Sequence, residues 1–184
     1  EDVSFDLDHV GWKGNPNVTF ERPKHKGLMW RRAWVDAVDQ LLGWSEMFRL
    51  VQNEGLGMIS QGAREWTDYT VTADVTPHLV SRAGVAARVQ GLTRFYALVV
   101  TREQKVQMLK CVHGESVIAE ADFAWSFGDT LEMTLSVVED QLVGQVNGKT
   151  VLTARDSSLD AGAAGLIVVD GRSATHKVRV SSSD

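Results

Sequence analysis

Residues 142–152, which read Leu-Val-Gly-Gln-Val-Asn-Gly-Lys-Thr-Val-Leu, contain the clearest hairpin signal in the chain. Asn147 and Gly148 stand between two apolar runs, and an Asn-Gly pair accepts the two positive φ angles of a type I′ turn. Because the twist of this turn matches that of antiparallel strands, the stretch predicts a β-hairpin. A shorter turn at Glu139 and Asp140 joins the hairpin to the strand before it.

On both sides of this hairpin the sequence has a hydrophobic period of two residues. Apolar and polar residues alternate, and alternation is typical of strands with one buried face. We predict further strands over 69–75, 85–90, 95–101, 106–111, 131–137, 165–170 and 177–180, with a charged turn at 102–105 and the last two strands joined through Gly171 and Arg172. No helical spacer long enough for a parallel crossover separates them. The sequence therefore predicts an all-β fold, an antiparallel two-sheet β-sandwich or jelly roll.

The first 65 residues give a weaker pattern. Strands are predicted over 3–7 and 17–21, and the runs 48–52 and 57–61 flank residues 53–56 as a hairpin. Residues 34–42 fit a strand that runs into one short helical turn. No linker divides the chain, so we expect a single domain over 1–184, with 1–47 as an N-terminal extension packed on the sandwich.

Composition excludes several classes of protein. The chain has 184 residues, a formal net charge of −5 and one cysteine. One cysteine forms no internal disulfide, and the acidic balance argues against nucleic acid or an anionic membrane surface as partner. No apolar run approaches the roughly 20 residues of a membrane span. The first residues, Glu1-Asp2-Val3, include no initiator Met and carry no signal-peptide pattern, so we expect an excised or processed cytoplasmic piece.

Catalytic motifs are absent from the sequence. It contains no P-loop, no Gly-x-Ser-x-Gly, no Cys-x-x-Cys and no His-Glu-x-x-His, and its five histidines show no ligand spacing. Glu120 and Asp122 are the nearest approach to a glycosidase carboxylate pair, with Asp74 as a further acid, but solvated turn residues explain the pair better. Cys111 is expected to be a small buried apolar residue. We therefore expect this domain alone not to be an enzyme.

Oxygen ligands for calcium are available in two places. Asp2, Asp6 and Asp8 lie near the N-terminus, and Asp156 and Asp160 lie before the last strands. Carboxylates are ligands that Ca²⁺ prefers, but neither group has EF-hand spacing. The sequence therefore leaves open whether the domain binds a structural calcium ion.

Aromatic and guanidinium groups form the most suggestive pattern. Sugar rings stack on aromatic faces, and their hydroxyls take hydrogen bonds from Arg, Gln and Lys side chains. For Tyr96, packing in the core explains the pattern as well as contact with a ligand does. For Trp66, packing in the core is the better explanation. The candidate ligand-binding residues are Arg88, Gln90, Arg94, Tyr96, Lys110, Trp30 and Trp34.

A family resemblance covers about residues 48 to 180. Trp66-Thr67-Asp68-Tyr69-Thr70-Val71, Gly84-Val85-Ala86-Ala87-Arg88, Arg94-Phe95-Tyr96-Ala97-Leu98, Leu142-Val143-Gly144-Gln145-Val146-Asn147-Gly148, Asp156 and Gly165-Leu166 resemble the concanavalin A-like, laminin-G-like jelly rolls. Within these the chain is similar to bacterial 3-keto-disaccharide hydrolase domains and to the C-terminal sandwich of exo-inulinases. The motifs are strand and turn determinants, so the resemblance implies fold more than activity.

Two stretches carry a narrower resemblance, Phe5-Asp6-Leu7-Asp8 and Trp30-Arg31-Arg32-Ala33-Trp34-Val35. They resemble the β-sandwich that follows the catalytic part of large bacterial ADP-ribosylglycohydrolase-like proteins. This resemblance implies an accessory module beside a catalytic domain. We therefore expect a non-catalytic module that binds a carbohydrate or an ADP-ribose-like glycoside. The alternatives are a weak glycoside hydrolase or lyase acting on a disaccharide, and a purely structural interdomain module.

Overall fold

Strands make up nearly all the regular structure in the computed structural model, which describes residues 16–21, 33–42 and 47–183. No helix in these ranges is long and apolar enough to cross a membrane. The strands are β1 (Asn17–Glu21), β2 (Val35–Ala37), β3 (Gln40–Leu42), β4 (Phe48–Gln61), β5 (Tyr69–His78), β6 (Arg82–Gly91), β7 (Arg94–Thr101), β8 (Lys105–Val112), β9 (Glu115–Asp122), β10 (Leu131–Val138), β11 (Gln141–Val146), β12 (Lys149–Arg155) and β13 (Ala163–Ser182).

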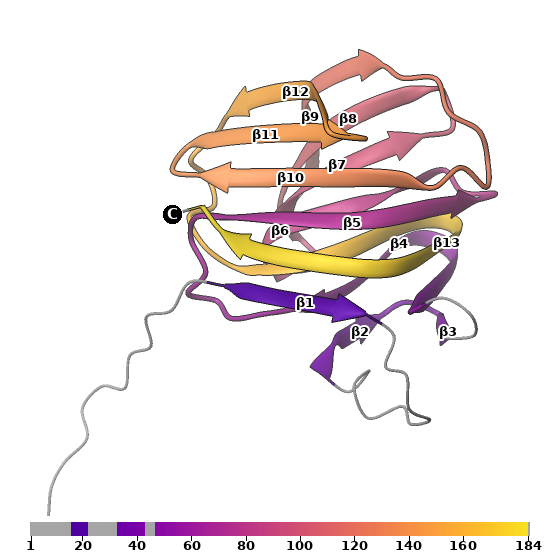
Figure 1. The fold of residues 1–184 in the computed structure, drawn as a ribbon, viewed down its shortest axis with the longest axis horizontal. Helices are drawn as coiled ribbons and strands as arrows, with labels where there is room; N and C mark the ends of the chain where they lie inside the picture. Colours follow the sequence, from indigo (N-terminus) through magenta and orange to yellow (C-terminus); the bar gives the residue numbers. More distant parts are fainter. Residues whose placement is uncertain (1–15, 22–32, 43–46, 184) are drawn as a thin grey trace, which may run out of the picture.

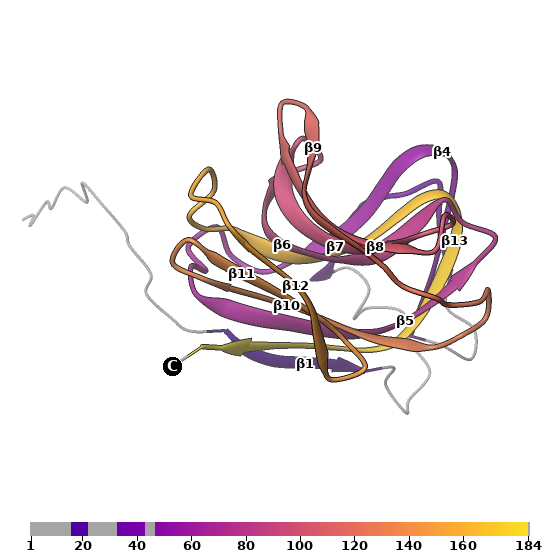
Figure 2. The same ribbon diagram turned by 90° about the horizontal axis from the view of Figure 1, so that it is seen from above.

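The long strand β13 connects the two layers of the fold (Figure 1). Its C-terminal half pairs with β5, which continues through β10 and β11 to β12. Its N-terminal half pairs with β6, which continues through β7 and β8 to β9. Every pair is antiparallel, and the continuous sheet folds over into two packed layers (Figure 2). This confirms the predicted antiparallel β-sandwich.

The main core lies between the layers and follows the predicted alternation. Val71, Leu135 and Leu98 point inward and are fully buried, while Thr72 and Thr134 on the outer face share a hydrogen bond of 3.0 Å. Burying one such aliphatic side chain stabilises the fold by about 1.5–3 kcal/mol. The period of two therefore places the core correctly.

A second apolar cluster lies on the opposite face of the β6–β7–β8 layer. It contains Ala86, Ala97, Val99, Leu109 and Ile167, which alternate with main-core residues along the same strands. Figure 2 shows that β4 and β9 rise on either side of this layer, so its outer face is concave. The buried residues of this face are apolar, and Cys111 is among them, as predicted.

The hairpin predicted over residues 142–152 is confirmed. Asn147 and Gly148 have φ angles of 51° and 73°, as a type I′ turn requires, and they connect β11 to β12. Asn147 also accepts a hydrogen bond from the Glu132 main-chain N–H at 3.0 Å, which holds the turn against β10.

Two predicted strand breaks are wrong. Residues 48–61 form one strand, β4, and the segments predicted at 165–170 and 177–180 are parts of one strand, β13. The two long strands pair with each other on both sides of an irregularity, where residues 53–55 lie opposite Asp170. Gly55 has a φ of 72° and donates its N–H to Asp170 Oδ1 at 2.6 Å. The Asn-Glu-Gly turn signal therefore marks a bulge, because both flanking segments pair with the same partner.

Other local predictions are corrected at the sheet edges. Residues 34–42 contain two short strands, β2 and β3, which pair with β4, and a bend replaces the predicted helical turn. Glu120 and Asp122 lie on strand β9 and not in a turn, because β9 pairs along its length with β8. The predicted strand at 17–21 is confirmed as β1, which pairs with β13. The predicted strand at 3–7 lies outside the described residues.

Candidate functional site

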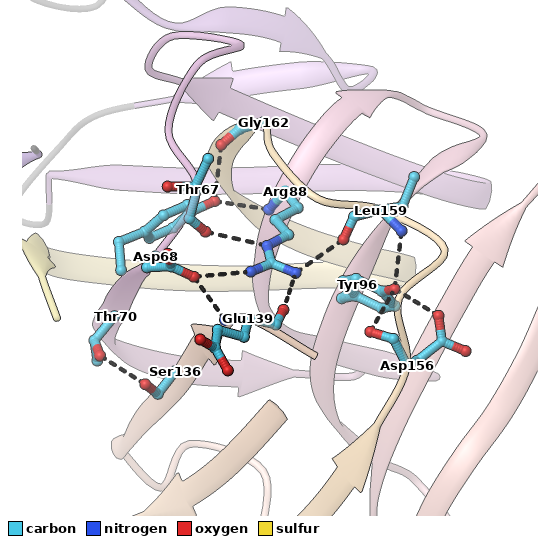
Figure 3. Close-up of polar contacts among 11 residues, drawn as sticks. Thr67, Asp68, Thr70, Arg88, Tyr96, Ser136, Glu139, Asp156, Leu159 and Gly162 are labelled. Carbon is cyan, nitrogen blue, oxygen red and sulfur yellow. Dashed lines mark hydrogen bonds and ion pairs between the residues drawn. The ribbon is translucent and has the colours of Figure 1, made fainter. Parts of the chain in front are cut away.

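Four of the predicted ligand-binding side chains bind a segment of their own chain, and Figure 3 shows two of them, Arg88 and Tyr96. Arg88, Gln90, Tyr96 and Lys110 all donate hydrogen bonds to residues 156–161, which connect β12 to β13. These four side chains therefore lie around one segment of the chain, which is bound among them. We call residues 156–162 the connecting loop.

Arg88 is the centre of this arrangement. A register shift between Ala87 and Gly91 and a φ of 49° turn its side chain inward, where only 2% of it is exposed. Its Nε donates to Thr67 O at 3.1 Å, and its Nη1 donates to Glu139 O at 2.8 Å and Leu159 O at 2.9 Å. Its Nη2 lies 3.3 Å from Asp68 Oδ1. Arg88 therefore joins three loops at one end of the sandwich.

Tyr69 fixes the backbone on which Arg88 stands. Its hydroxyl accepts the Arg88 N–H at 2.7 Å and lies 3.0 Å and 2.9 Å from the carbonyl oxygens of Gly162 and Ala163. Burial raises the pKa of this phenol well above its ordinary value. Tyr69 is therefore a neutral donor that ties β5 to the bulge of β6 and to the start of β13.

Tyr96, Lys110 and Asp156 form a second group beside Arg88. Asp156 Oδ1 accepts from the Tyr96 hydroxyl at 2.6 Å, and Oδ2 accepts from Lys110 Nζ at 2.5 Å. Burial and the adjacent carboxylate raise the pKa of Tyr96 to about 12. Burial alone would raise the pKa of Asp156, but hydrogen bonds from Lys110, Tyr96 and Ser158 outweigh it and hold this pKa far below its usual range.

The substitution Asp156→Asn should make the free energy of unfolding less sensitive to low pH. Because the folded pKa of Asp156 is lowered, its contribution to stability is complete above the unfolded value near pH 4 and is lost as the pH falls below it. We expect the variant to lose about 2 kcal/mol at pH 7 and a smaller amount at pH 2.5, because the contribution disappears fully only when the pH falls through the lowered folded pKa. Urea unfolding at both pH values measures this, with Asp160→Asn as the exposed control. An equal loss at both pH values would contradict the assignment.

Gln90 and Arg94 extend this network at its edge. Gln90 Nε2 donates to Ala161 O at 2.9 Å, and Arg94 Nε donates to Gln90 Oε1 at 3.0 Å. Trp34 is 5% exposed and packs edge-on against Phe20 and Phe48, so its ring is in the core. Trp30 lies outside the described residues.

Two of the acids weighed for catalysis, Glu120 and Asp74, are engaged in structural contacts. The Glu120 carboxylate on β9 accepts hydrogen bonds from Lys105 and Gln107 on the neighbouring strand β8, and these hydrogen bonds lower the pKa of Glu120. A general acid needs a raised pKa, so this environment does not favour that role. Asp122 lies opposite Lys105 in the same pair of strands. Asp74 Oδ1 accepts the main-chain N–H groups of His176 and Lys177 at 2.7 Å and 2.8 Å, where the pairing of β13 shifts.

The calcium ligands weighed from the sequence do not fit the ion where they are described. Lys110 lies against the Asp156 carboxylate, and a bound cation would stand beside its ammonium group. Within the ranges that the structure describes, no three His, Cys, Asp or Glu side chains are grouped to hold a metal. Asp2, Asp6 and Asp8 lie outside those ranges.

A hollow of about 320 Å³ opens beside Arg88, and we call it the Arg88 hollow. It is lined by Thr67, Asp68, Arg88, Glu139, Ser157, Leu159 and Asp160. Four of the five Arg88 N–H groups donate as described above, and the fifth has no acceptor among the described residues. Asp68 Oδ1 accepts from Arg88 and from the Glu139 N–H at 2.6 Å, whereas its Oδ2 has no partner in the described ranges. The hollow is therefore lined by a buried guanidinium with one unengaged N–H and by carboxylate oxygens that have no partner in the described ranges.

The outer face of the β5–β10–β11 layer holds a larger hollow of about 520 Å³. Thr72, Glu132, Thr134, Gln145 and Arg179 line it, together with Ala73, Asp74 and Lys177. A solvated antiparallel face is polar whether or not it binds a ligand. The Arg88 hollow is the stronger candidate because it is built around a buried charged group.

Arg88 was predicted from the sequence as a ligand-binding residue, whereas the loop residues that share its hollow were not, and Asp160 was considered only as a calcium ligand. Asp68, Glu139 and Asp160 are far apart in sequence and come together because β5, β11 and β13 begin, or nearly begin, at the same end of the sandwich. The signal available was their position: each stands in a short connection next to a predicted strand. Their common end follows only from the antiparallel topology.

Comparison with solved structures now decides the type of sandwich. A carbohydrate-binding module, CBM66 from Bacillus subtilis, matches with a TM-score of 0.76 and 20% identity over 82% of this chain and 96% of that chain. The fold is a concanavalin A-like jelly roll. This jelly roll is also similar to a legume lectin-like domain from Entamoeba histolytica, with a TM-score of 0.62 and 10% identity over 84% and 92% of the two chains.

Enzymes also use this jelly roll. An alginate lyase of polysaccharide lyase family 7 matches with a TM-score of 0.61 and 8% identity over 83% of this chain and 95% of that chain. No family model and no curated protein matches the sequence. At such identities the structural likeness establishes the fold, and function has to be argued from the site.

Proposed function

We propose that this jelly roll is a non-catalytic carbohydrate-binding module and that its ligand is a neutral glycoside held in the Arg88 hollow. The observation that carries the proposal is the free N–H of Arg88 beside the free oxygen of Asp68. A sugar hydroxyl accepts a hydrogen bond from the one and donates to the other. Glu139, Ser157 and Asp160 supply further groups for neighbouring hydroxyls.

The charge of the hollow supports a neutral ligand over an ADP-ribose-like one. Asp68, Glu139 and Asp160 line it, and the single guanidinium already contacts Asp68. A diphosphate brought beside these carboxylates would be repelled, whereas hydroxyls are not. The acceptor-rich lining therefore favours neutral sugars.

Rigidity of the hollow supports binding over catalysis. The guanidinium of Arg88 is held by three main-chain carbonyl oxygens and by Asp68. A site fixed before the ligand arrives loses little conformational entropy on binding. We propose that the domain, as a single unit over residues 1–184, serves as an accessory module of a larger bacterial hydrolase. The similar carbohydrate-binding module supports this at the level of fold.

Binding should depend on the two outer carboxylates of the hollow. The double variant Glu139→Gln/Asp160→Asn keeps the shape of both side chains and removes two charged acceptors, so we expect at least a tenfold weaker affinity for the best neutral disaccharide. Calorimetry with a panel of neutral mono- and disaccharides and with ADP-ribose measures this.

Glu54→Gln is the matched control, because Glu54 lies in the bulge of β4, outside the hollow. It should bind like the unchanged chain. If no sugar in the panel binds, or if the double variant binds as well as the control, the proposal fails. Tighter binding of ADP-ribose than of any neutral sugar would overturn the charge argument.

A further inference from the structure

A third hollow lies at the end of the sandwich opposite the Arg88 hollow, and we call it the aromatic hollow. It is lined by Arg102, Gln104, Trp125, Ser126 and Phe127, with a volume of about 280 Å³. These residues lie in the β7–β8 and β9–β10 connections, whereas the Arg88 hollow involves the β10–β11 and β12–β13 connections. Because consecutive antiparallel strands reverse direction, the two sets of connections are at opposite ends.

Phe127 presents an exposed ring in this hollow. It is 45% exposed, whereas Trp125 is 6% exposed and contacts it edge-on, with ring centroids 5.3 Å apart. Trp125 Nε1 donates to Thr101 O at 2.9 Å, which anchors the supporting ring. One ring therefore fixes the position of the other and leaves part of it open to solvent.

The loop that carries Phe127 is held by three hydrogen bonds from its main-chain N–H groups, one of them to a side-chain carboxylate. Ser126 N–H donates to Asp129 Oδ2 at 2.8 Å, Asp129 N–H donates back to Ser126 O at 3.0 Å, and Gly128 N–H donates to Pro77 O at 2.9 Å. A ligand that stacks on Phe127 therefore meets a platform that is already ordered, which lowers the entropic cost of binding.

Two of the polar side chains of the aromatic hollow, Arg102 and Gln104, offer donors. The main-chain N–H of Trp125 points to the side chain of Gln104 at 2.9 Å. Because an N–H can only donate, Gln104 offers its oxygen there and keeps its NH₂ group for a ligand. The Arg102 guanidinium has no acceptor among the described residues, and Ser126 adds a hydroxyl. A platform edged by a free cation and an amide donor fits a sugar ring that bears a carboxylate.

We propose that the aromatic hollow binds acidic sugars, such as uronic acid units, with the ring stacked on Phe127 and the carboxylate paired with Arg102. This site is independent of the Arg88 hollow, whose free groups are mainly acceptors. The domain then binds two chemically different sugars at its two ends.

Oligogalacturonate and its methyl ester are a matched pair of probes, since esterification removes the charge of each carboxyl group and adds a single methyl group. Calorimetry should show at least tenfold tighter binding of the acid than of the ester. Phe127→Ala should weaken both about tenfold, because it removes the platform. Arg102→Gln should bring the acid down to the affinity of the ester. Leu92→Ala, which truncates an exposed apolar residue in the β6–β7 turn, is the control and should change neither.

NMR chemical shifts locate the site in the intact chain. The acid should shift the amides of 101–104 and 125–129 and leave those of 157–160 in place. Variants that lose binding with unchanged melting curves support the proposal. It is overturned if the acid does not bind, if acid and ester bind alike, or if the shifts fall elsewhere. The variant Glu139→Gln/Asp160→Asn should bind the acid normally, which separates this result from the neutral-sugar proposal.

Discussion

Replacing Arg88 with alanine is expected to lower the free energy of unfolding by about 3–5 kcal/mol. The side chain is 2% exposed, and its removal leaves the carbonyl oxygens of Thr67, Glu139 and Leu159 without their donor. A cavity left in place of a long side chain adds to the loss. For a domain of ordinary stability, this is a large part of the total.

Urea unfolding of Arg88→Ala, Arg88→Lys and Arg172→Ala measures this loss. Lysine keeps the charge but cannot reproduce the planar fork, so we expect an intermediate loss. Arg172 is exposed, and its truncation should change stability by less than about 0.5 kcal/mol. If Arg88→Ala is no worse than Arg172→Ala, the side chain does not stabilise the connecting loop as described.

Gly84→Ala is expected to cost about 3 kcal/mol or more. A Cβ atom at this position would lie 1.9 Å from Leu98 O and 2.8 Å from Val99 Cα, both main-chain atoms of β7. Main-chain atoms in a paired strand cannot move aside without breaking hydrogen bonds of the sheet, so the strain is not relieved locally. Thermal unfolding measures the loss as a lower melting temperature.

Gly114→Ala is the control for this substitution. Gly114 has open space around the position of a Cβ atom, and its φ is not positive. Alanine there should change stability by less than about 1 kcal/mol, with a small gain expected from a stiffer unfolded chain. Equal melting temperatures for the two variants would show that β6 and β7 do not approach as closely as Gly84 indicates.

The fold was largely predictable because its determinants are local. Alternation in β5 and β10 and the Asn-Gly turn at 147–148 depend only on neighbouring residues. The errors arose where pairing overrides a local signal. Residues 53–55 look like a turn and form a bulge, because the segments on both sides pair with β13. No local pattern reports that shared partner.

The candidate sites were predictable only in part. Arg88, Tyr96 and Lys110 were chosen for their chemistry, and they do converge, but hydrogen bonds satisfied inside the protein look the same in sequence as those offered to a ligand. Phe127 was not selected, since exposure of one ring depends on how Trp125 packs beneath it. Charge and residue type indicate a kind of site, whereas topology decides which residues share it.

Strand β13 has a consequence for how the molecule assembles. It follows all the other strands in sequence, yet it pairs with β1, β4, β5 and β6 and so belongs to both layers. Neither layer is complete until this last strand docks, and its contacts reach across most of the chain. Closure of such distant contacts is slow, so we expect folding in milliseconds to seconds. Both layers should form in a single cooperative step, and a chain still emerging from the ribosome would keep the edges of β5 and β6 unpaired until β13 is made.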